Sequence, residues 1–419
     1  LQKTHLCQGD TIFSRKRIPL MLIVQKYGGT SVGSLERIEE VAKRVIESKE
    51  NGNDLVVVVS AMSGVTNLLI EQAEFYTKSP NLRDMDLLLS SGERVTSALL
   101  SIALNAKGYE AIAFSGAKAG ILTNSVFTKA RIEHIDTKIV KDELKKGKIV
   151  VVAGFQGVDK NGFVTTLGRG GSDLSAVALA GALKADLCEI YTDVDGIYTT
   201  DPRIEPKARK LDKISYDEML ELASLGAKVL QNRSVELAKK LGVQVVTRSS
   251  FNHNEGTLIT KEEGMEQALV SGIALDKNQA RVTLRKIKDR PGIAAEIFSA
   301  LADKNINVDM IIQNVGVDGA TNLGFTVPEN ELDLAKQTMQ KMLENTIIES
   351  DKDVVKVSVV GVGMKSHSGV ASKAFKALAK EGINIGMIST SEIKISMIVQ
   401  EKYGELAVRA LHEVYELDK

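Results

Sequence analysis

The sequence contains no tryptophan and only two cysteines, Cys7 and Cys188, which lie far apart. Two distant cysteines cannot build a disulfide framework or a cysteine-rich zinc site. So little cysteine suits a reducing compartment, and we therefore expect a cytoplasmic protein.

The sequence also lacks a net charge and long apolar runs. Lys+Arg and Asp+Glu balance at 54 each, so nothing favours nucleic acid or an anionic membrane as a partner. The longest apolar runs, at residues 55–59 and 149–153, are strand-sized. They fall well below the roughly 18 residues that a membrane-spanning helix needs, so we expect no membrane association.

What is present is enough apolar material for more than one core. Hydrophobic residues make up 43% of the 419 residues, which suits two or three domains. Residues 1–20 are polar and basic and lack the apolar stretch of a signal peptide. We expect a disordered basic leader there, with the folded chain starting at Met21.

Short apolar stretches alternate with amphipathic helical stretches from residue 21 to residue 263. This alternation predicts an α/β domain with a mainly parallel sheet. The predicted strands are residues 22–25, 55–60, 149–153, 187–192, 243–248 and 257–260, and the predicted helices are residues 34–49, from about 67, and 173–183.

Residues 264–419 contain an internal repeat. A shift of 77 residues (369 − 292 = 77) relates Gly292 to Gly369, Phe298 to Phe375, Leu301 to Leu378, Asn307 to Asn384 and Met310 to Met387. Each copy has a strand (282–284; 354–360), a helix and further strands, which predicts two α+β domains over 264–345 and 346–419. Small sheets of this kind leave edges exposed, so such units usually pair. Two structural domains without a ligand remain the alternative.

A glycine-rich turn directly follows the first predicted strand, in the run Lys26-Tyr27-Gly28-Gly29-Thr30-Ser31. Two glycines let the backbone approach phosphate oxygens, and we expect Thr30 and Ser31 to cap the next helix. Taken alone, the run could equally be a tight turn. No Walker A sequence occurs, which excludes a P-loop kinase as far as motifs go. Gly361-Val-Gly-Met-Lys looks like a nucleotide loop but lies inside the second repeat.

In combination, the motifs resemble the aspartate kinases of the amino acid kinase family across nearly all of residues 22–419. The resemblance rests on the glycine-rich run and on residues 60–67, 91–94, 154–157, 165–173 and 192–203. It implies a three-layer α/β amino acid kinase fold with a mainly parallel central sheet. A pair of C-terminal α+β ferredoxin-like (βαββαβ) ACT domains would follow.

The resemblance also implies the site residues. ATP would be bound by Lys26, Tyr27, Gly28, Gly29, Ser60, Thr192, Asp193, Tyr198, Thr199, Thr200, Asp201, Pro202, Arg203 and Lys228. Aspartate would be bound by Thr66, Asn67, Glu93, Arg169, Gly170, Gly171 and Ser172. Glu93 would hold the substrate ammonium and Arg169 a carboxylate, since a guanidinium offers two parallel donors.

The implied chemistry is phosphoryl transfer from MgATP, with Lys26 and Asp193 as catalytic residues and no protein-bound metal site. No general base is needed, because an aspartate side chain with a pKa near 3.9 is already ionised. Lys26 and Mg²⁺ would offset the repulsion between the acceptor carboxylate and the γ-phosphate, and Asp193 would orient Lys26. His134, His253 and His412 are predicted to lie in solvated helix or loop.

The repeats are implied to bind lysine and/or threonine as effectors. The implied contacts are Asp289, Arg290, Pro291, Gly292, Ile293, Ala294, Asn307, Val308, Asp309 and Gln313, and in the second copy Val370, Ala371, Asn384, Ile385 and Ser391. Backbone N–H groups at the helix starts would meet the effector carboxylate, and Asp289 or Asp309 its ammonium. Gly386 replaces Asp309 in the second copy, so the two sites should differ. We expect a homodimer or homotetramer formed through these domains.

The predicted reaction converts L-aspartate and ATP to 4-phospho-L-aspartate, the first step toward lysine, threonine and methionine. One alternative is a related kinase acting on acetylglutamate, glutamate or a nucleoside monophosphate, against which the Gly-Glu-Arg motif and the repeat argue. A fused homoserine dehydrogenase is disfavoured because the second repeat runs almost to Lys419. A silent amino-acid sensor is disfavoured because Lys26, Arg169 and Lys228 are all retained.

Overall fold

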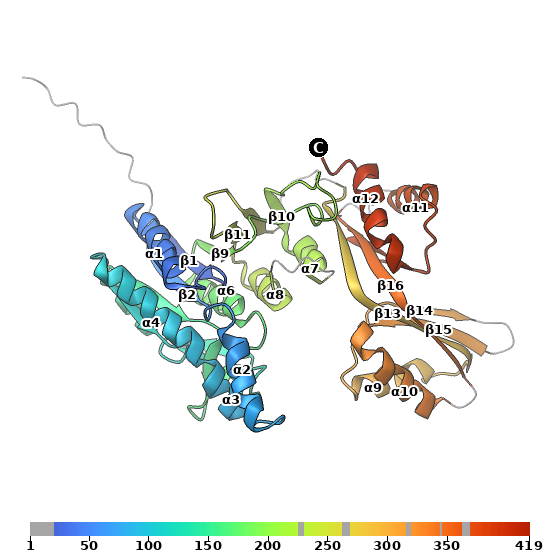
Figure 1. Cartoon of the computed structure of the whole chain (residues 1–419), viewed down its shortest axis with the longest axis horizontal. Helices are drawn as coiled ribbons and strands as arrows, with labels where there is room; N and C mark the ends of the chain where they lie inside the picture. Colours follow the sequence, from blue (N-terminus) through green and yellow to red (C-terminus); the bar gives the residue numbers. More distant parts are fainter. Residues whose placement is uncertain (1–20, 225–229, 262–268, 316–319, 344–345, 363–368) are drawn as a thin grey trace, which may run out of the picture.

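The protein consists of an α/β part and a smaller α+β part (Figure 1). The computed structural model describes residues 21–224, 230–261, 269–315, 320–343, 346–362 and 369–419. The predicted leader and Lys228 lie outside the described residues.

An eight-stranded sheet forms the centre of the α/β part, in the order β10-β12-β11-β9-β1-β2-β6-β3. Its strands are β1 (Leu22–Tyr27), β2 (Asp54–Val59), β3 (Ala111–Phe114), β6 (Ile149–Ala153), β9 (Leu187–Thr192), β10 (Lys213–Ser215), β11 (Val245–Ser249) and β12 (Thr257–Thr260). Within this sheet only β11 and β12 pair in an antiparallel manner. The predicted mainly parallel sheet is therefore confirmed.

Helices cover both faces of this sheet. The helices of the α/β part are α1 (Leu35–Glu50), α2 (Val65–Tyr76), α3 (Leu82–Leu89), α4 (Ser91–Ala106), α5 (Lys138–Lys145), α6 (Gly171–Leu183), α7 (Tyr216–Ser224) and α8 (Asn232–Leu241). Alternate residues of β2 belong to different cores: Val56 packs with Val177 of α6, and Val57 packs with Val41 of α1. Strands buried on both faces are continuously apolar, as β2 and β6 are, and the three-layer arrangement is confirmed.

Helix α1 begins one turn later than the glycine-rich run suggests. Its N-cap is Ser34, whose side chain accepts a hydrogen bond from the backbone N–H of Arg37. The expectation that Thr30 and Ser31 cap this helix is wrong, because the chain first makes a turn in which Ser31 N–H donates to Gly28 C=O (2.9 Å).

A second, four-stranded sheet was not predicted. Its order is β5-β4-β7-β8, with β4 (Ile121–Thr123), β5 (Ile132–Ile135), β7 (Gln156–Asp159) and β8 (Val164–Thr166). Buried Asp86 of α3 ties helix and sheet together, since its carboxylate accepts hydrogen bonds from Thr166 N–H, Thr166 Oγ1 and Thr128 N–H at 2.6–3.0 Å. This polar anchor fixes the helix pair α3–α4 against β8.

By length and composition, Leu82–Ala106 is the one segment among the described residues that could cross a membrane. It comprises α3 and α4, and half of its most apolar window is buried inside the protein. Buried helices of globular proteins pass the same test, so the segment is weak evidence for a membrane span.

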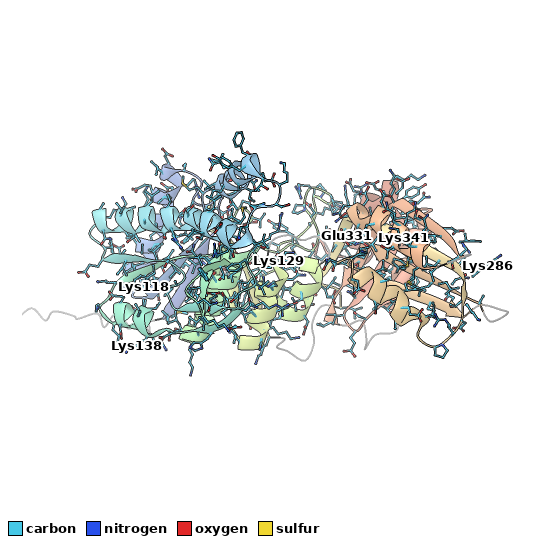
Figure 2. All side chains as sticks on the ribbon, turned by 90° about the horizontal axis from the view of Figure 1, so that it is seen from below. Lys118, Lys129, Lys138, Lys286, Glu331 and Lys341 are labelled. Carbon is cyan, nitrogen blue, oxygen red and sulfur yellow. The ribbon has the colours of Figure 1, made fainter. Side chains whose placement is uncertain are left out.

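Charged side chains are spread over both parts of the molecule (Figure 2). Lys118 and Lys138 project from the α/β part, and Lys286 and Lys341 from the α+β part. This dispersal agrees with the balanced composition.

The α+β part is built on one six-stranded antiparallel sheet, in the order β14-β15-β13-β16-β18-β17. Its strands are β13 (Gly272–Lys288), β14 (Ile311–Val315), β15 (Ala320–Val327), β16 (Ile347–Val360), β17 (Met387–Thr390) and β18 (Lys394–Gln400). Its helices are α9 (Ile293–Ala302), α10 (Leu332–Met342), α11 (Val370–Lys380) and α12 (Gly404–Val414).

The two repeats share their longest strands. Ile273, near the start of β13, packs in the core under α11 and α12, whereas Val282 of the same strand packs under α9 and α10. The predicted strand 282–284 is thus a fragment of β13. The predicted boundary between residues 345 and 346 stays a prediction. The two cores do not separate at this point of the chain, because β13 contributes residues to both of them.

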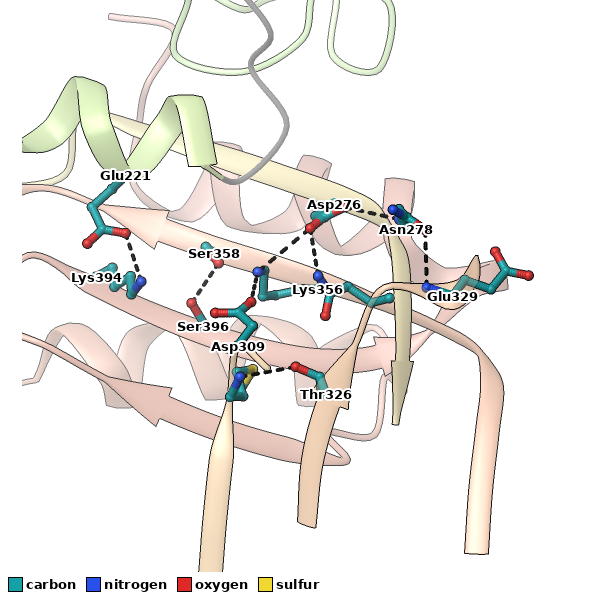
Figure 3. Close-up of polar contacts among 12 residues, drawn as sticks. Glu221, Asp276, Asn278, Asp309, Thr326, Glu329, Lys356, Ser358, Lys394 and Ser396 are labelled. Carbon is teal, nitrogen blue, oxygen red and sulfur yellow. Dashed lines mark hydrogen bonds and ion pairs between the residues drawn. The ribbon is translucent and has the colours of Figure 1, made fainter. Parts of the chain in front are cut away.

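The two parts of the molecule are docked through several polar contacts. Lys394 Nζ of β18 lies 2.8 Å from Glu221 Oε2 of α7 (Figure 3), and Ser271 Oγ donates to Glu218 of the same helix. The α+β part therefore contacts a helix of the α/β part directly.

Candidate active site

Two cavities open at the carboxyl ends of the central parallel strands. The chain turns in opposite directions on either side of β1, since β2 and β9 flank it in the sheet. Ligands of open α/β sheets bind at such a switch point. The first cavity, of about 300 Å³, we call the strand-end cavity; the second, of about 770 Å³, we call the loop cavity.

The strand-end cavity gathers residues from five segments of the chain. Predicted site residues lining it are Lys26, Gly29, Ser60, Thr66, Glu93, Arg169, Gly170, Gly171 and Ser172, together with Ala61, Met62, Ser63, Gly64, Phe155, Gly168 and Asp173. The cations Lys26 and Arg169 and the carboxylates Glu93 and Asp173 thus share one pocket, as binding of a charged ligand requires.

Lys26 is the buried cation of this cavity. Its Nζ lies 2.6 Å from Asp173 Oδ1, and both side chains are nearly buried, at 10% and 13% exposure. Asp173 stands in the first turn of α6, where a carboxylate is favoured by the helix dipole. The ion pair fixes the direction of the lysine, so its ammonium is held in place before any ligand arrives.

Glu93 is the second carboxylate, carried by α4. Its Oε1 accepts a hydrogen bond from Ala61 N–H at 3.1 Å, while the buried Oε2 has no hydrogen-bond partner among the described residues. Burial raises the pKa of this carboxyl from its ordinary 4.5 to about 7. The close approach depends on Gly92, because a Cβ there would lie 2.7 Å from Ala61 Cβ. An incompletely paired buried carboxylate is a natural partner for a ligand cation.

Arg169 faces the same cavity from the loop between β8 and α6. Its side chain is exposed, and within the described part of the chain its guanidinium makes no ion pair. The next residue, Gly170, has φ +69°, a left-handed conformation that favours glycine, and caps α6. The loop is fixed from behind, since Gln231 Nε2 donates to Arg169 C=O at 3.0 Å. The guanidinium is thus presented, unpaired, on a fixed backbone.

The loop cavity is formed by the segment after β9. Its lining comprises Thr192, Asp193, Val194, Asp195, Gly196, Ile197, Tyr198, Thr200, Asp201, Pro202, Arg203, Ile204, Leu222, Ser249, Asn252, Ile273, Ala274 and Leu275. Bonds within the loop shape it: Tyr198 Oη donates to Asp195 Oδ1 at 2.9 Å, and Arg203 pairs with Asp201 at 2.7 Å, which lowers the pKa of the Asp201 carboxyl. A polar loop facing apolar side chains suits a ligand with a flat base and a charged end.

The two cavities are neighbours because β1 and β9 are adjacent parallel strands. Tyr27 pairs with Tyr191 in register, and Gly28 N–H donates to Tyr191 C=O at 3.1 Å. Each strand continues directly into its cavity-lining loop. A ligand spanning both loops would therefore have one end near Lys26.

Comparison with known proteins identifies the family. Residues 21–249 match the model of the amino acid kinase family, and residues 285–343 and 357–415 match an ACT domain. The chain is 64% identical over 405 residues to the aspartokinase of Helicobacter pylori, covering 95% of this chain and 100% of that protein. It is 56% identical over 406 residues to that of Pseudomonas aeruginosa, with 95% and 98% coverage. The chain belongs to the aspartokinases of the amino acid kinase family.

A solved structure supports this membership. Aspartokinase III of E. coli, in complex with aspartate and ADP, superposes with a TM-score of 0.79 at 27% identity, covering 94% of this chain and 99% of that chain. The same enzyme in complex with lysine and aspartate gives a TM-score of 0.75 at 27% identity, again with 94% and 99% coverage. The chain is therefore a kinase, a phosphotransferase with a carboxyl acceptor.

Not every predicted site residue of this aspartokinase reaches a cavity. Tyr27 is fully buried and its ring stacks on Tyr191 at 4.7 Å. Thr199 is 1% exposed and its hydroxyl bonds to His412, while Gly28 and Asn67 line neither cavity. Direct side-chain contacts of these residues with ATP or aspartate have no support from their placement and stay predictions.

Sequence reasoning missed the partner of Lys26. We expected Asp193 to orient this lysine, but the carboxylate in contact with it is Asp173. Asp193 lines the other cavity and accepts a hydrogen bond from Thr192 Oγ1 at 3.1 Å. Asp173 ends the motif 165–173, but a sequence gives no sign of which acidic residue meets a given lysine in space.

The prediction for the histidines is wrong in one case. His134 and His253 are exposed, although His134 lies on β5. His412 is only 2% exposed, because α12 packs against the α/β part at this point. The sequence did not indicate which face of α12 is buried and which face is solvated.

The predicted effector residues lie around two helix starts and two edge strands. Gly292 and Gly369 have φ +91° and +102° and precede α9 and α11 in the same way. Arg290 forms a bidentate pair with Glu296 at 2.7 and 2.5 Å, and Asn307 N–H donates to Glu331 Oε2 at 2.9 Å. The backbone supports the repeat symmetry that the sequence predicted.

A buried lysine crosses between the repeats at Asp309 (Figure 3). Lys356 of β16, 3% exposed, contacts the Asp309 carboxylate and lies 3.7 Å from Asp276 Oδ2. In the second copy, a Cβ on Gly386 would lie 3.0 Å from Arg281 Nη1. The two matching positions therefore meet different cations, a physical basis for unequal sites.

Proposed function

We propose that this aspartokinase transfers the γ-phosphate of ATP to the β-carboxylate of L-aspartate, giving 4-phospho-L-aspartate and ADP. A β-carboxylate oxygen forms a bond to the γ-phosphorus as the bond to the ADP oxygen breaks. The observation that carries the proposal is the strand-end cavity, where the Lys26–Asp173 pair, the unpaired Glu93 Oε2 and the unpaired Arg169 guanidinium converge.

The acceptor would be held by its two charged backbone groups. Glu93 offers a buried carboxylate to the ammonium, and Arg169 a two-pronged donor to the α-carboxylate. The side-chain carboxylate is then directed toward Lys26. This arrangement selects a small amino acid with a second carboxylate.

Lys26 would stabilise the negative charge that gathers as acceptor and phosphate approach. A preorganised cation costs no rearrangement during the reaction, and loss of one such contact typically costs about 3–4 kcal/mol. Asp173 keeps the ammonium aimed without touching the substrate. It acts as a positioning residue.

ATP would enter the loop cavity, with its phosphates directed toward β1. The described residues contain no group of three His, Cys, Asp or Glu side chains that could hold a metal ion. Mg²⁺ would arrive on the nucleotide, since Mg²⁺ usually keeps phosphate and water ligands and takes one or two carboxylates. Asp193, which lines the loop cavity, would supply such a carboxylate, and the ion would neutralise phosphate charge.

One assay with three acceptors tests the proposal. The enzyme is incubated with MgATP, hydroxylamine and aspartate, glutamate or acetylglutamate, and the hydroxamate formed from an acyl phosphate is measured. We expect product with aspartate alone. Product mainly with another acceptor would assign a related kinase activity, and none with any acceptor would leave only the sensor hypothesis.

We further propose that lysine, threonine or both inhibit the enzyme by binding to the repeats. Support comes from the matched helix starts of α9 and α11 and from the E. coli relative solved with lysine and aspartate. Edge strands β14 and β17 carry exposed Ile311 and Ile388, which suits pairing of two copies as a homodimer or homotetramer.

The place of the reaction follows from its product. An acyl phosphate is activated for reduction or acyl transfer, as a first step toward lysine, threonine and methionine requires. The scarcity of cysteine supports a cytoplasmic location.

A further inference from the structure

The wall of the loop cavity is not made by the kinase part alone. Three consecutive residues at the start of β13, Ile273, Ala274 and Leu275, line it opposite the loop 192–204. Ile273 also belongs to the core under α11 and α12. The regulatory part therefore supplies apolar surface to the proposed nucleotide site.

Thr199 is the point where the loop is bound to the regulatory part. It stands between Tyr198 and Thr200, which both line the loop cavity, but it is itself 1% exposed. Its C=O accepts a hydrogen bond from Ile273 N–H at 2.7 Å, and its N–H donates to Arg209 C=O at 2.9 Å. One residue of the loop thus joins the first regulatory strand.

The Thr199 side chain makes a second contact with the regulatory part. Its Oγ1 accepts a hydrogen bond from Arg209 N–H at 3.0 Å and lies 2.9 Å from Nε2 of His412 on α12. Burial lowers the pKa of His412, which favours the neutral imidazole, and Nε2 can accept a hydrogen bond from the hydroxyl or donate one to its oxygen. The backbone groups and the hydroxyl of Thr199 are therefore all engaged in hydrogen bonds.

The packing around Thr199 leaves little room for another arrangement. A Cβ on Gly272 would lie 2.8 Å from Thr199 C=O, so only glycine lets β13 approach this closely. Because Tyr198 and Thr200 are the chain neighbours of Thr199, a shift of Thr199 must displace both from the cavity wall. Their position depends on α12 and β13.

We infer that the regulatory part completes the nucleotide site, and that His412 is a positioning residue which holds the nucleotide loop through Thr199. The inference rests on the proposed function, which places ATP in the loop cavity. His412 does not touch the nucleotide, since it does not line this cavity. Its effect should therefore appear in nucleotide affinity and not in the chemical step.

The test measures ADP binding by calorimetry in the full chain, alongside the KM values for ATP and aspartate. His412→Leu and Thr199→Val remove the bond from either side. His412→Leu should weaken ADP binding by about threefold to tenfold, the range for one lost hydrogen bond, and raise the ATP KM equally. Thr199→Val should have at least this effect, because it also removes the acceptor of the Arg209 N–H. The kcat and the aspartate KM should change by less than about twofold, as expected when uniform nucleotide binding is lost.

Conservative variants distinguish the loss of the His412–Thr199 hydrogen bond from a general loss of packing. His412→Gln and Thr199→Ser keep a polar partner and should restore most of the ADP affinity. The matched control is Tyr415→Phe, which removes a 2.7 Å bond to Val370 C=O inside the regulatory part. It should leave ADP affinity unchanged even where it lowers the melting temperature.

The possible outcomes separate the inference from the proposed function. ADP binding at wild-type strength in His412→Leu, or in Thr199→Val should the leucine variant not fold, overturns the inference. So does an equal loss in Tyr415→Phe, which would indicate general loosening. Failure of the wild-type chain to bind ADP would instead refute the nucleotide site itself.

Discussion

At the scale of single residues, the strand-end cavity holds charges that are buried before substrate binds. Lys26 is paired with Asp173, whereas Glu93 has one oxygen without a partner among the described residues. Incomplete pairing destabilises the free enzyme and is relieved by a ligand ammonium. Such sites bind strongly because the protein has already ordered and desolvated its groups.

Lys26→Ala should abolish phosphoryl transfer while leaving the fold intact. The residue stabilises charge and fills no apolar core, so activity should fall at least about a hundredfold, or roughly 3 kcal/mol. Turnover of the purified variant measures this. Lys43→Ala, which removes an exposed pair with Glu40 on α1, is the control and should behave as wild type. Near-normal turnover in Lys26→Ala would refute its role.

Arg169→Lys should raise the KM for aspartate much more than that for ATP. A point ammonium cannot reproduce the two parallel donors of a guanidinium, so we expect about a tenfold increase for aspartate. Steady-state kinetics with each substrate varied give both constants. An equal increase in both would place Arg169 on the nucleotide side.

Glu93 should give kcat/KM for aspartate a rising limb near pH 7. Burial raises the pKa of its carboxyl to about 7, so below that pH the free enzyme carries a neutral group that attracts ammonium weakly. As pH rises through 7 the carboxylate forms and kcat/KM increases. Glu93→Gln should be slower and flat over pH 6–8, and an unchanged limb in that variant would assign the titration elsewhere.

The raised pKa of Glu93 also lowers the stability of the folded protein as pH rises, whereas the same rise in pH increases aspartate binding. A carboxyl whose pKa is raised by folding destabilises the native state as pH rises from its ordinary 4.5 to about 7, because charge must form inside the protein. Glu93 therefore improves binding as pH rises through about 7, at a cost in stability that accumulates between pH 4.5 and about 7.

At the scale of elements, α3 and β8 set the spacing of the cavity walls. The helix pair α3–α4 carries Glu93, and β8 leads into the loop with Arg169. Buried Asp86 joins the two by accepting two hydrogen bonds from Thr166, one from its N–H and one from its Oγ1, and by accepting the Thr128 N–H on both carboxylate oxygens. This anchor keeps the ammonium and carboxylate contacts of the substrate at a fixed separation.

Asp86→Asn should raise the KM for aspartate and lower stability by about 1–3 kcal/mol. The amide has one acceptor oxygen for backbone N–H groups of both Thr166 and Thr128, and its NH₂ group faces further donors. Urea unfolding and aspartate kinetics measure the two effects. Asp84→Asn, in the same helix but exposed, should change neither; a KM unaffected by Asp86→Asn would show that the spacing is held by other contacts.

The two repeats of the regulatory part differ in the charges around one pair of matching positions. Asp309 already meets the buried Lys356, so an effector ammonium at this position must share or displace an existing cation. The second copy has Gly386 there and faces Arg281. We therefore expect the two repeats to bind an effector with unequal affinities.

At the scale of the whole molecule, the α/β part and the α+β part contact each other directly. Lys394 of β18 pairs with Glu221 of α7, and His412 of α12 meets Thr199 of the nucleotide loop. An effector that favours one arrangement of the regulatory sheet can thereby change nucleotide affinity, typically by about 1–3 kcal/mol.

Titration with lysine and threonine, singly and together, should inhibit the intact enzyme. Asp289→Ala and Ser391→Ala should weaken inhibition without lowering uninhibited activity, because both positions are exposed and line neither cavity. Activity and calorimetric binding are measured together. No inhibition and no binding in any combination would refute the sensor role of the repeats.

Local patterns in the sequence determined the secondary structure and the fold class. The continuous apolar runs of β2 and β6, the helical spacing in α9 and α11 and the shift of 77 residues between copies (369 − 292 = 77) are short-range features. They depend on burial and backbone geometry within a few residues, so they could be identified before the structure. The roles of the glycine-rich loops and of the charged motif residues came instead from the resemblance to the aspartate kinases.

Tertiary structure alone decided which charges meet. Lys26 pairs with Asp173 and not with Asp193, and Glu93 keeps one oxygen without a partner in the part of the chain that the structure describes. His412 is buried against a loop more than two hundred residues earlier in the chain. Such contacts join segments that are far apart in the chain, and no periodic pattern in the sequence relates these segments to each other. They are selected by the packing of whole elements, because the pairing of a buried charge depends on every strand and helix that brings its partner within reach.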